Sequence, residues 1–302
     1  MNTLKRGDKV AVVASSGKVD VEATLQGIEV LREWGLIVPN DQEWAAEWGS
    51  LAGADSRRIG KLQMALDDPD IKAIFMARGG YGLTRIIDRI DWSKFIDHPK
   101  YIIGFSDVTA LHICVNNLGF PSIHAPMVGQ FSKKELEVSL SQLKGILFYD
   151  EYPSIKGEVN EKFSDQVIEG EIVGGNLCLL ADQIATYSEL NTENKILFIE
   201  EVGEKPYQID RYLTHLKRSG AFKNVKAIIL GQFSGIPDEE EPFFPLSINR
   251  MVKEKVNVPV ITDVTAGHDY PNTPIKLGGK YQIKCIGDKA LIEVTTSVNF
   301  NR

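Results

Sequence analysis

The hydrophobic positions in the first half of the chain alternate between short apolar runs and helical spacings. Runs of strand length, rich in β-branched residues, occupy residues 9–14, 71–77 and 101–104, as is typical of buried strands. Between them, residues 21–34 and 56–66 place apolar side chains three or four positions apart, which predicts helices. Strands that alternate with helices favour a mostly parallel sheet covered by helices.

The second half repeats this alternation after an interruption. Residues 151–170 are polar, contain Pro and Gly and lack a long apolar run. We therefore assign them to a linker between an N-terminal domain, residues 1–150, and a C-terminal domain, residues 171–302. The elements expected after the interruption are strands at 168–173, 196–199, 225–230 and 258–261, a helix from about Asn176, a helix after Pro206 and a hairpin at 281–294. The sequence predicts an α/β protein of two α/β domains, the C-terminal one smaller and either α/β or rich in strands.

Composition narrows the class of protein. The 302 residues are 43% hydrophobic and 25% charged, as in ordinary globular proteins. The net charge of -7 argues against nucleic acid as a partner, because that binding needs clustered cationic charge. No apolar stretch reaches the roughly 18 residues of a transmembrane helix, so we expect no membrane partner. The N-terminal apolar run is too short for a signal peptide.

Cysteine and histidine spacing bears on location and on metal chemistry. The three cysteines, Cys114, Cys178 and Cys285, lie far apart and form neither a disulfide framework nor a metal cluster. This pattern favours a reducing, cytoplasmic location. No HExxH, CxxC or helically spaced histidine pair is present, so we expect no metal site.

One segment places a serine between a buried strand and a helix. Ser106 follows an apolar run, with Gly104 two positions before it and a helical pattern beginning at about Asp107. Such a turn, a nucleophile elbow, presents a serine Oγ beside a helix N-terminus, whose N–H groups can stabilise an oxyanion. Val108 stands where the usual GxSxG motif has its second glycine. The segment alone leaves two interpretations, a nucleophile and a helix cap.

Three further features supply parts of the same chemistry. Residues 78–82 hold three glycines, so their N–H groups can approach a ligand closely, or they form only a tight turn. Glu200 and Glu201 end an apolar strand, where ligands of α/β sheets gather, although carboxylates there are often simply solvated. His268 lies in a loop rich in Gly and Pro. Together, Ser106, Glu200 and His268 provide the parts of a hydrolytic triad.

Several stretches of the chain carry a resemblance to a known family. They are residues 77–82, 103–111, 124–127, 174–177, 197–207, 267–268 and 274–278. On these stretches the chain resembles the L,D-carboxypeptidase family of serine peptidases, which includes muropeptide L,D-carboxypeptidases and microcin C immunity peptidases. The resemblance extends from residue 8 to about residue 280, nearly the whole chain.

The resemblance implies an activity and the residues that perform it. Ser106 is then the nucleophile, His268 the general base and Glu200 the carboxylate that orients the base. The family usually has Asp at the position of Glu201, which leaves Glu201 as the alternative. We choose Glu200 because it directly follows the apolar run.

The resemblance also implies the rest of the site and its surroundings. The backbone N–H groups of Gly80 and Asp107 form the oxyanion hole, no cofactor is needed, and the site lies between two domains. The expected substrate is a small peptide, a murein tetrapeptide that loses a terminal D-alanine, and the expected assembly is a homodimer. Arg78, at the start of the glycine loop, is a candidate to bind the terminal carboxylate.

Two other functions stay open at this point. An immunity-type peptidase would cleave an aminoacyl-nucleotide antibiotic and would need aromatic side chains to stack the base. Trp44, Trp48 and Trp92 fit that need, and they fit ordinary packing equally well. A two-domain solute-binding protein would close on its ligand without chemistry. It would require export, and in it the three triad residues would be a coincidence.

Overall fold

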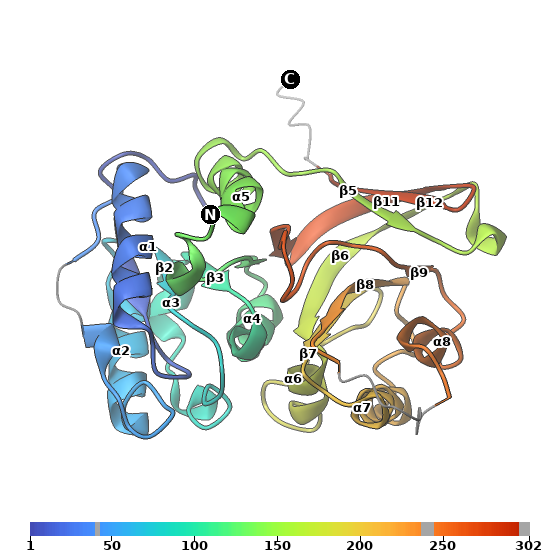
Figure 1. Ribbon diagram of the computed structural model, residues 1–302, viewed down its shortest axis with the longest axis horizontal. Helices are drawn as coiled ribbons and strands as arrows, with labels where there is room; N and C mark the ends of the chain where they lie inside the picture. Colours follow the sequence, from blue (N-terminus) through green and yellow to red (C-terminus); the bar gives the residue numbers. More distant parts are fainter. Residues whose placement is uncertain (40–42, 237–244, 296–302) are drawn as a thin grey trace.

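The computed structural model describes residues 1–39, 43–236 and 245–295. Two sheets lie side by side, each covered by its own helices (Figure 1). Residues 296–302, the end of the expected C-terminal domain, lie outside the described residues.

The first sheet has the strand order β1-β2-β3-β4-β10. Strands β1 to β4 are parallel, whereas β10 pairs antiparallel with β4. The strands are β1 (Lys9–Val13), β2 (Ile71–Met76), β3 (Tyr101–Gly104), β4 (Ser122–His124) and β10 (Ile275–Leu277). An edge strand of the sheet built by the first half of the chain is therefore supplied by the second half.

Helices cover both faces of the first sheet, since the strands are buried on both sides. The helices are α1 (Val21–Glu33), α2 (Asp55–Asp67), α3 (Ser93–Asp97), α4 (Thr109–Asn117) and α5 (Glu137–Tyr149). Helices α1 and α5 share one hydrophobic core with the sheet, and α2, α3 and α4 share another. Helix α1 begins where the sequence predicts, because the Asp20 carboxylate accepts a hydrogen bond from the Ala23 N–H at 3.0 Å and so caps the helix.

The second sheet has the strand order β5-β12-β11-β6-β7-β8-β9. Its strands are β5 (Ile155–Glu158), β6 (Gln166–Asn176), β7 (Ile196–Val202), β8 (Ala227–Ser234), β9 (Val260–Ile261), β11 (Gly279–Ile286) and β12 (Lys289–Val294). Glu158 and Thr262 exchange backbone hydrogen bonds of 3.0 and 2.8 Å. Because these residues belong to the two opposite edges, the sheet curls back on itself around an apolar interior.

Three helices pack outside β7, β8 and β9. They are α6 (Leu177–Asp182), α7 (Pro206–Ser219) and α8 (Ile248–Lys253). Short 3-10 helices complete the described structure: η1 (Glu43–Ala45), η2 (Ile87–Arg89), η3 (Ser106–Val108), η4 (Val128–Gln130), η5 (Lys134–Leu136) and η6 (Glu161–Phe163). Helix α7 has Pro206 in its first turn and ends at Gly220, which adopts a left-handed conformation, as the proline and glycine positions predict.

The predicted α/β architecture with a mostly parallel first sheet is confirmed, and so is the C-terminal hairpin, formed by β11 and β12. Residues 151–170, which the sequence assigns to a linker, contain β5 and the first residues of β6, and both strands belong to the second sheet. The position of the domain boundary stays a prediction.

Candidate active site

Ser106 is the first residue of η3 and follows the end of β3 by two positions. The backbone adopts an uncommon conformation there. Its φ is 64°, in the left-handed region that non-glycine residues seldom occupy. Its Oγ makes no hydrogen bond within the described part of the chain and does not cap the following helix. A strained serine between a buried strand and a helix is the geometry of a nucleophile elbow.

The glycine loop after β2 lies directly against this serine. A Cβ added to Gly79 would lie 3.0 Å from the Ser106 Cβ and 3.2 Å from its Oγ, so a side chain there would crowd the serine. Gly80 has a φ of 110°, which favours glycine. Ser106, Gly79, Gly80 and His268 line one cavity of about 460 Å³. The glycines thus bring backbone to within van der Waals distance of the serine.

Two backbone N–H groups near the serine make no hydrogen bond within the described residues. Within the described residues, neither the Gly80 N–H nor the Asp107 N–H donates a hydrogen bond. The Asp107 carboxylate, by contrast, is buried and accepts a hydrogen bond from the Leu83 N–H at 3.0 Å. It therefore ties η3 to the segment that follows the glycine loop. Burial raises the pKa of this carboxyl group.

Glu200 and His268 form a hydrogen-bonded pair. The His268 Nδ1 lies 2.7 Å from the Glu200 Oε2, and the Glu200 side chain is 0% exposed. A carboxylate only accepts hydrogen bonds, so Nδ1 is the donor of this contact, and in the imidazole form of the ring Nε2 is the proton acceptor. His268 also packs on Phe105, with ring centroids 4.7 Å apart. No hydrogen bond joins His268 to Ser106 within the described chain, and such contacts are often loose before substrate binds.

The loop that carries His268 is held by its neighbours. Gly267 donates its N–H to the Asn272 Oδ1 at 3.1 Å, and Asp269 donates its N–H to the Gln232 Oε1 at 3.0 Å. Gly267 has a φ of 146°. A Cβ there would lie 3.0 Å from the Gln232 Cβ. Gln232 is in β8, so the second sheet supports this loop from one side.

Glu201 points to the other side of β7, as alternation along a strand requires. Its carboxylate accepts hydrogen bonds of 2.8 Å from Asn176 Nδ2, the Cys178 N–H and the Val202 N–H. Asn176 and Cys178 lie at the start of α6. Glu201 therefore holds the N-terminus of α6, while Glu200 contacts the histidine.

Glu201 should also make stability depend on pH. Burial raises its pKa to about 7 from 4.5, so the folded state binds this proton more tightly than the unfolded state does. The resulting stabilisation is complete below about pH 4.5, and on the order of 3 kcal/mol is lost as pH rises to about 7. We expect Glu201→Gln to remove this part of the pH dependence, measured by urea unfolding of both proteins from pH 4.5 to 8. Parallel curves would contradict the expectation.

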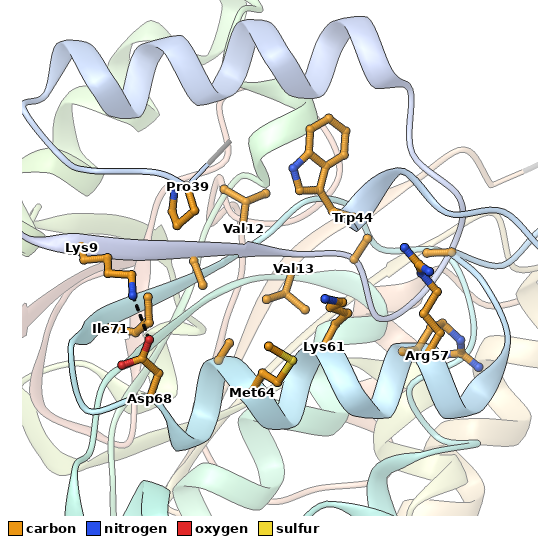
Figure 2. Close-up of a pocket in the computed structure, with 15 residues that line it drawn as sticks. Lys9, Val12, Val13, Pro39, Trp44, Arg57, Lys61, Met64, Asp68 and Ile71 are labelled. Carbon is orange, nitrogen blue, oxygen red and sulfur yellow. Dashed lines mark hydrogen bonds and ion pairs between the residues drawn. The ribbon is translucent and has the colours of Figure 1, made fainter. Parts of the chain in front are cut away.

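A second cavity, of about 280 Å³, lies between β1 and α2 (Figure 2). Its lining includes Trp44 and the ion pair between Lys9 Nζ and Asp68, 3.0 Å long. None of the triad residues reaches it. The cavity beside Ser106 is therefore the candidate active site. Arg78 lines that cavity, and its Nη1 donates a hydrogen bond to the Lys18 carbonyl.

Sequence reasoning missed several residues that build the site. The Asp107 carboxylate, Asn272 and Gln232 make their contacts only after remote segments come together, so no local pattern marks them. Among the described residues, no three His, Cys, Asp or Glu side chains gather as metal ligands. None of the described helices is both long and apolar enough to span a bilayer.

The fold and this site define a two-domain α/β protein with a strained serine directly after a buried strand. Residues 10–125 match the LD-carboxypeptidase N-terminal domain, and residues 169–283 match the LD-carboxypeptidase C-terminal domain. A putative carboxypeptidase of Synechocystis is 33% identical over 93% of this chain and 92% of its own length. The chain belongs to the LD-carboxypeptidase family and is a peptidase of carboxypeptidase type.

Other relatives and solved structures agree with this family. The probable murein peptide carboxypeptidase of Bacillus subtilis is 31% identical over 97% of this chain and 94% of that protein. The crystal structure of muramoyltetrapeptide carboxypeptidase from Oxalobacter formigenes superposes with a TM-score of 0.85, at 28% identity, over 95% of this chain and 99% of that one. Microcin C7 self immunity protein MccF shares the fold, with a TM-score of 0.81 at 20% identity over 97% of this chain and 98% of that one.

Proposed function

We propose that this protein is a serine L,D-carboxypeptidase that releases a terminal D-alanine from murein tetrapeptides. Ser106 is the nucleophile, His268 the general base and Glu200 the group that orients the base. The single observation that carries this assignment is the 2.7 Å contact between His268 Nδ1 and Glu200 Oε2, in a histidine that lines the same cavity as the strained serine.

The reaction follows from these positions. His268 Nε2 takes the Ser106 proton while Oγ attacks the carbonyl carbon of the last peptide bond. The negative charge that develops on the carbonyl oxygen is bound by the N–H groups of Gly80 and Asp107. The protonated histidine then gives its proton to the leaving amino group. A water molecule then hydrolyses the acyl-enzyme and frees Ser106.

The substrate class is supported by the relatives and by one cation. The Pseudomonas aeruginosa relative named murein tetrapeptide carboxypeptidase is 29% identical over 87% of this chain and 89% of that protein. A carboxypeptidase must bind the terminal carboxylate of its substrate, and a guanidinium suits that group. Arg78 is exposed and lines the cavity next to the glycine loop. We assign the terminal carboxylate to Arg78.

Matched peptides test the function. Tetrapeptides that end in D-Ala or L-Ala, and one that ends in D-Ala amide, are incubated with the purified protein and followed by mass spectrometry. We expect release of free D-Ala from the first peptide. The other two peptides should be cleaved at least about 10²-fold more slowly, because each would leave polar groups of the site unpaired. Equal cleavage of all three, or cleavage only of the amide, would overturn the proposal.

We also propose that the protein acts in the cytoplasm, in peptidoglycan recycling, as a homodimer. Cys114, Cys178 and Cys285 are all free, as in a reducing compartment. The homodimer rests on the family resemblance. An immunity peptidase of the MccF type is the less favoured function, because the relatives of 29% identity and above carry carboxypeptidase names, whereas MccF shares 20%.

A further inference from the structure

Behind the triad lies a buried histidine that has no place in the reaction above. His124 ends β4, next to the strand that leads to the nucleophile, and pairs with Gly104 of β3. Its side chain is fully buried. Its ring packs against Phe105 and Phe198, at centroid distances of 5.5 and 5.0 Å. Phe105 in turn packs on His268, so His124 lies one side chain away from the base.

Neither ring nitrogen of His124 has a hydrogen-bond partner among residues 1–39, 43–236 and 245–295. Burial holds the pKa of this histidine well below its usual value, His112 and His268 lower the pKa further, and the Asn272 carboxamide acts in the opposite direction. The ring is therefore neutral, with one N–H donor and one acceptor nitrogen. A buried polar group without a partner lowers the stability of the fold by about 1–3 kcal/mol. A donor that bonds to the acceptor nitrogen of His124 would remove this cost.

Asn272 carries a donor that is also unpaired within the described residues. Its Oδ1 accepts the Gly267 N–H at 3.1 Å, which requires its Nδ2 to face the other way. That Nδ2 is buried and has no hydrogen-bond partner. The Asn272 N–H donates to the Ser139 Oγ of α5 at 3.1 Å, so the residue is anchored on the first sheet's helices. Ile275, three residues after Asn272, pairs with His124 across β10 and β4. The unpaired Asn272 donor and the unpaired His124 ring nitrogen of the described structure therefore belong to the same buried region behind the loop of the base.

We propose that His124 is a positioning residue for this reaction and that it acts on the base through Asn272. A ring nitrogen of His124 accepts a hydrogen bond from Asn272 Nδ2, and this keeps Asn272 Oδ1 on the Gly267 N–H. Gly267 directly precedes His268. His124 therefore couples the strand beside Ser106 to the loop that carries the base. This inference rests on the proposed role of His268 as the base.

Kinetics of matched variants test the proposal. His124→Leu removes the acceptor and places an apolar side chain in the buried position. We expect kcat to fall about 10²-fold, the size of loss that a small misplacement of the base causes. We expect KM to change less than threefold. His124→Gln retains an acceptor oxygen and should recover kcat to within about tenfold of wild type. The double variant with Asn272→Leu should be no slower than the slower single variant, because His124 acts only through the Asn272 contact that Asn272→Leu already removes.

A matched control separates positioning from stability. Asn116 is buried, and its Nδ2 donates to the Phe120 carbonyl and Ser122 Oγ at the far end of β4. Asn116→Leu should lower the melting temperature and leave kcat unchanged. A kcat for His124→Leu within threefold of wild type, or an equal loss of kcat in Asn116→Leu, would overturn the proposal. So would a kcat loss in the double variant equal to the product of the single losses.

A readout without substrate keeps this inference distinct from the proposed function. Nuclear magnetic resonance of the ¹⁵N-labelled full chain detects the His268 Nδ1 proton that is hydrogen-bonded to Glu200. We expect this signal to broaden or shift in His124→Leu. If His124→Leu does not fold, Asn272→Asp serves in its place, because it keeps an acceptor for the Gly267 N–H and lacks only the Nδ2 donor. An unchanged signal would overturn the role of His124. A wild-type protein that shows the signal and spares the D-Ala peptide would overturn only the substrate assignment.

Discussion

Replacement of Ser106 by alanine is expected to lower kcat on the order of 10⁶-fold, the scale seen when a serine protease loses its nucleophile. The remaining activity would come from the N–H groups of Gly80 and Asp107 and from substrate binding. The measurement is D-Ala release by both proteins at saturating peptide. Because Oγ makes no hydrogen bond in the described structure, we expect the free energy of unfolding of Ser106→Ala to stay within about 0.5 kcal/mol of wild type.

Glycine at the same position distinguishes a nucleophile from a structural serine. The φ of 64° at Ser106 costs a non-glycine residue about 1–2 kcal/mol, and glycine avoids this cost at some loss of chain entropy. Ser106→Gly should therefore be inactive and no less stable than Ser106→Ala. A variant that lost stability but kept activity would assign Ser106 to helix capping instead.

The second large effect is expected at Glu200. In Glu200→Gln the side chain presents an amide to His268 Nδ1, and an amide N–H stabilises the tautomer whose Nε2 carries the proton. Nε2 then no longer accepts the Ser106 proton. We expect kcat to fall about 10⁴-fold, as in the corresponding change in a known triad. Peptide turnover measured across the neutral pH range gives the size of the loss.

Glu201→Gln is the matched control, one residue along the same strand. Its carboxylate contacts Asn176 Nδ2 and the backbone of Cys178 and Val202. Neither Asn176 nor Cys178 lines the cavity, and Val202, which does, is contacted only through its backbone N–H. We expect kcat of this variant to stay within about tenfold of wild type. If Glu201→Gln lost more activity than Glu200→Gln, the orienting role would belong to Glu201.

The sequence predicts most strands and helices of this protein because each carries a strong local pattern. Residues 9–13 and 71–76 are apolar runs bounded by turns, and the helix beginning at residue 21 has both a cap and an apolar face. The short strands are different. β10 has three residues and pairs with β4, about 150 positions earlier, so its existence depends on tertiary contacts that no window of sequence contains.

The residues of the candidate site also fall into those that sequence patterns indicate and those that depend on tertiary contacts. Ser106, Glu200 and His268 could be chosen from strand ends, a glycine loop and a family resemblance. The choice between Glu200 and Glu201 depended on a strand end alone, and the contacts of both carboxylates are visible only in three dimensions. The left-handed backbone of Ser106 and the contacts of Asn272 also depend on packing between remote segments, so sequence patterns could not supply them.

The strand β10 has an evolutionary consequence. It completes the edge of the first sheet, and the chain then enters the second sheet directly, with the Gly278 N–H bonded to the Ile172 carbonyl at 2.7 Å. A recombination event that exchanged the second half for an unrelated module would remove the base together with this strand. It would leave the outer edge of β4 unpaired and open to association with other chains, while the inner edge stays paired with β3. We therefore expect the two halves to be inherited as one unit, although each is matched by its own family model.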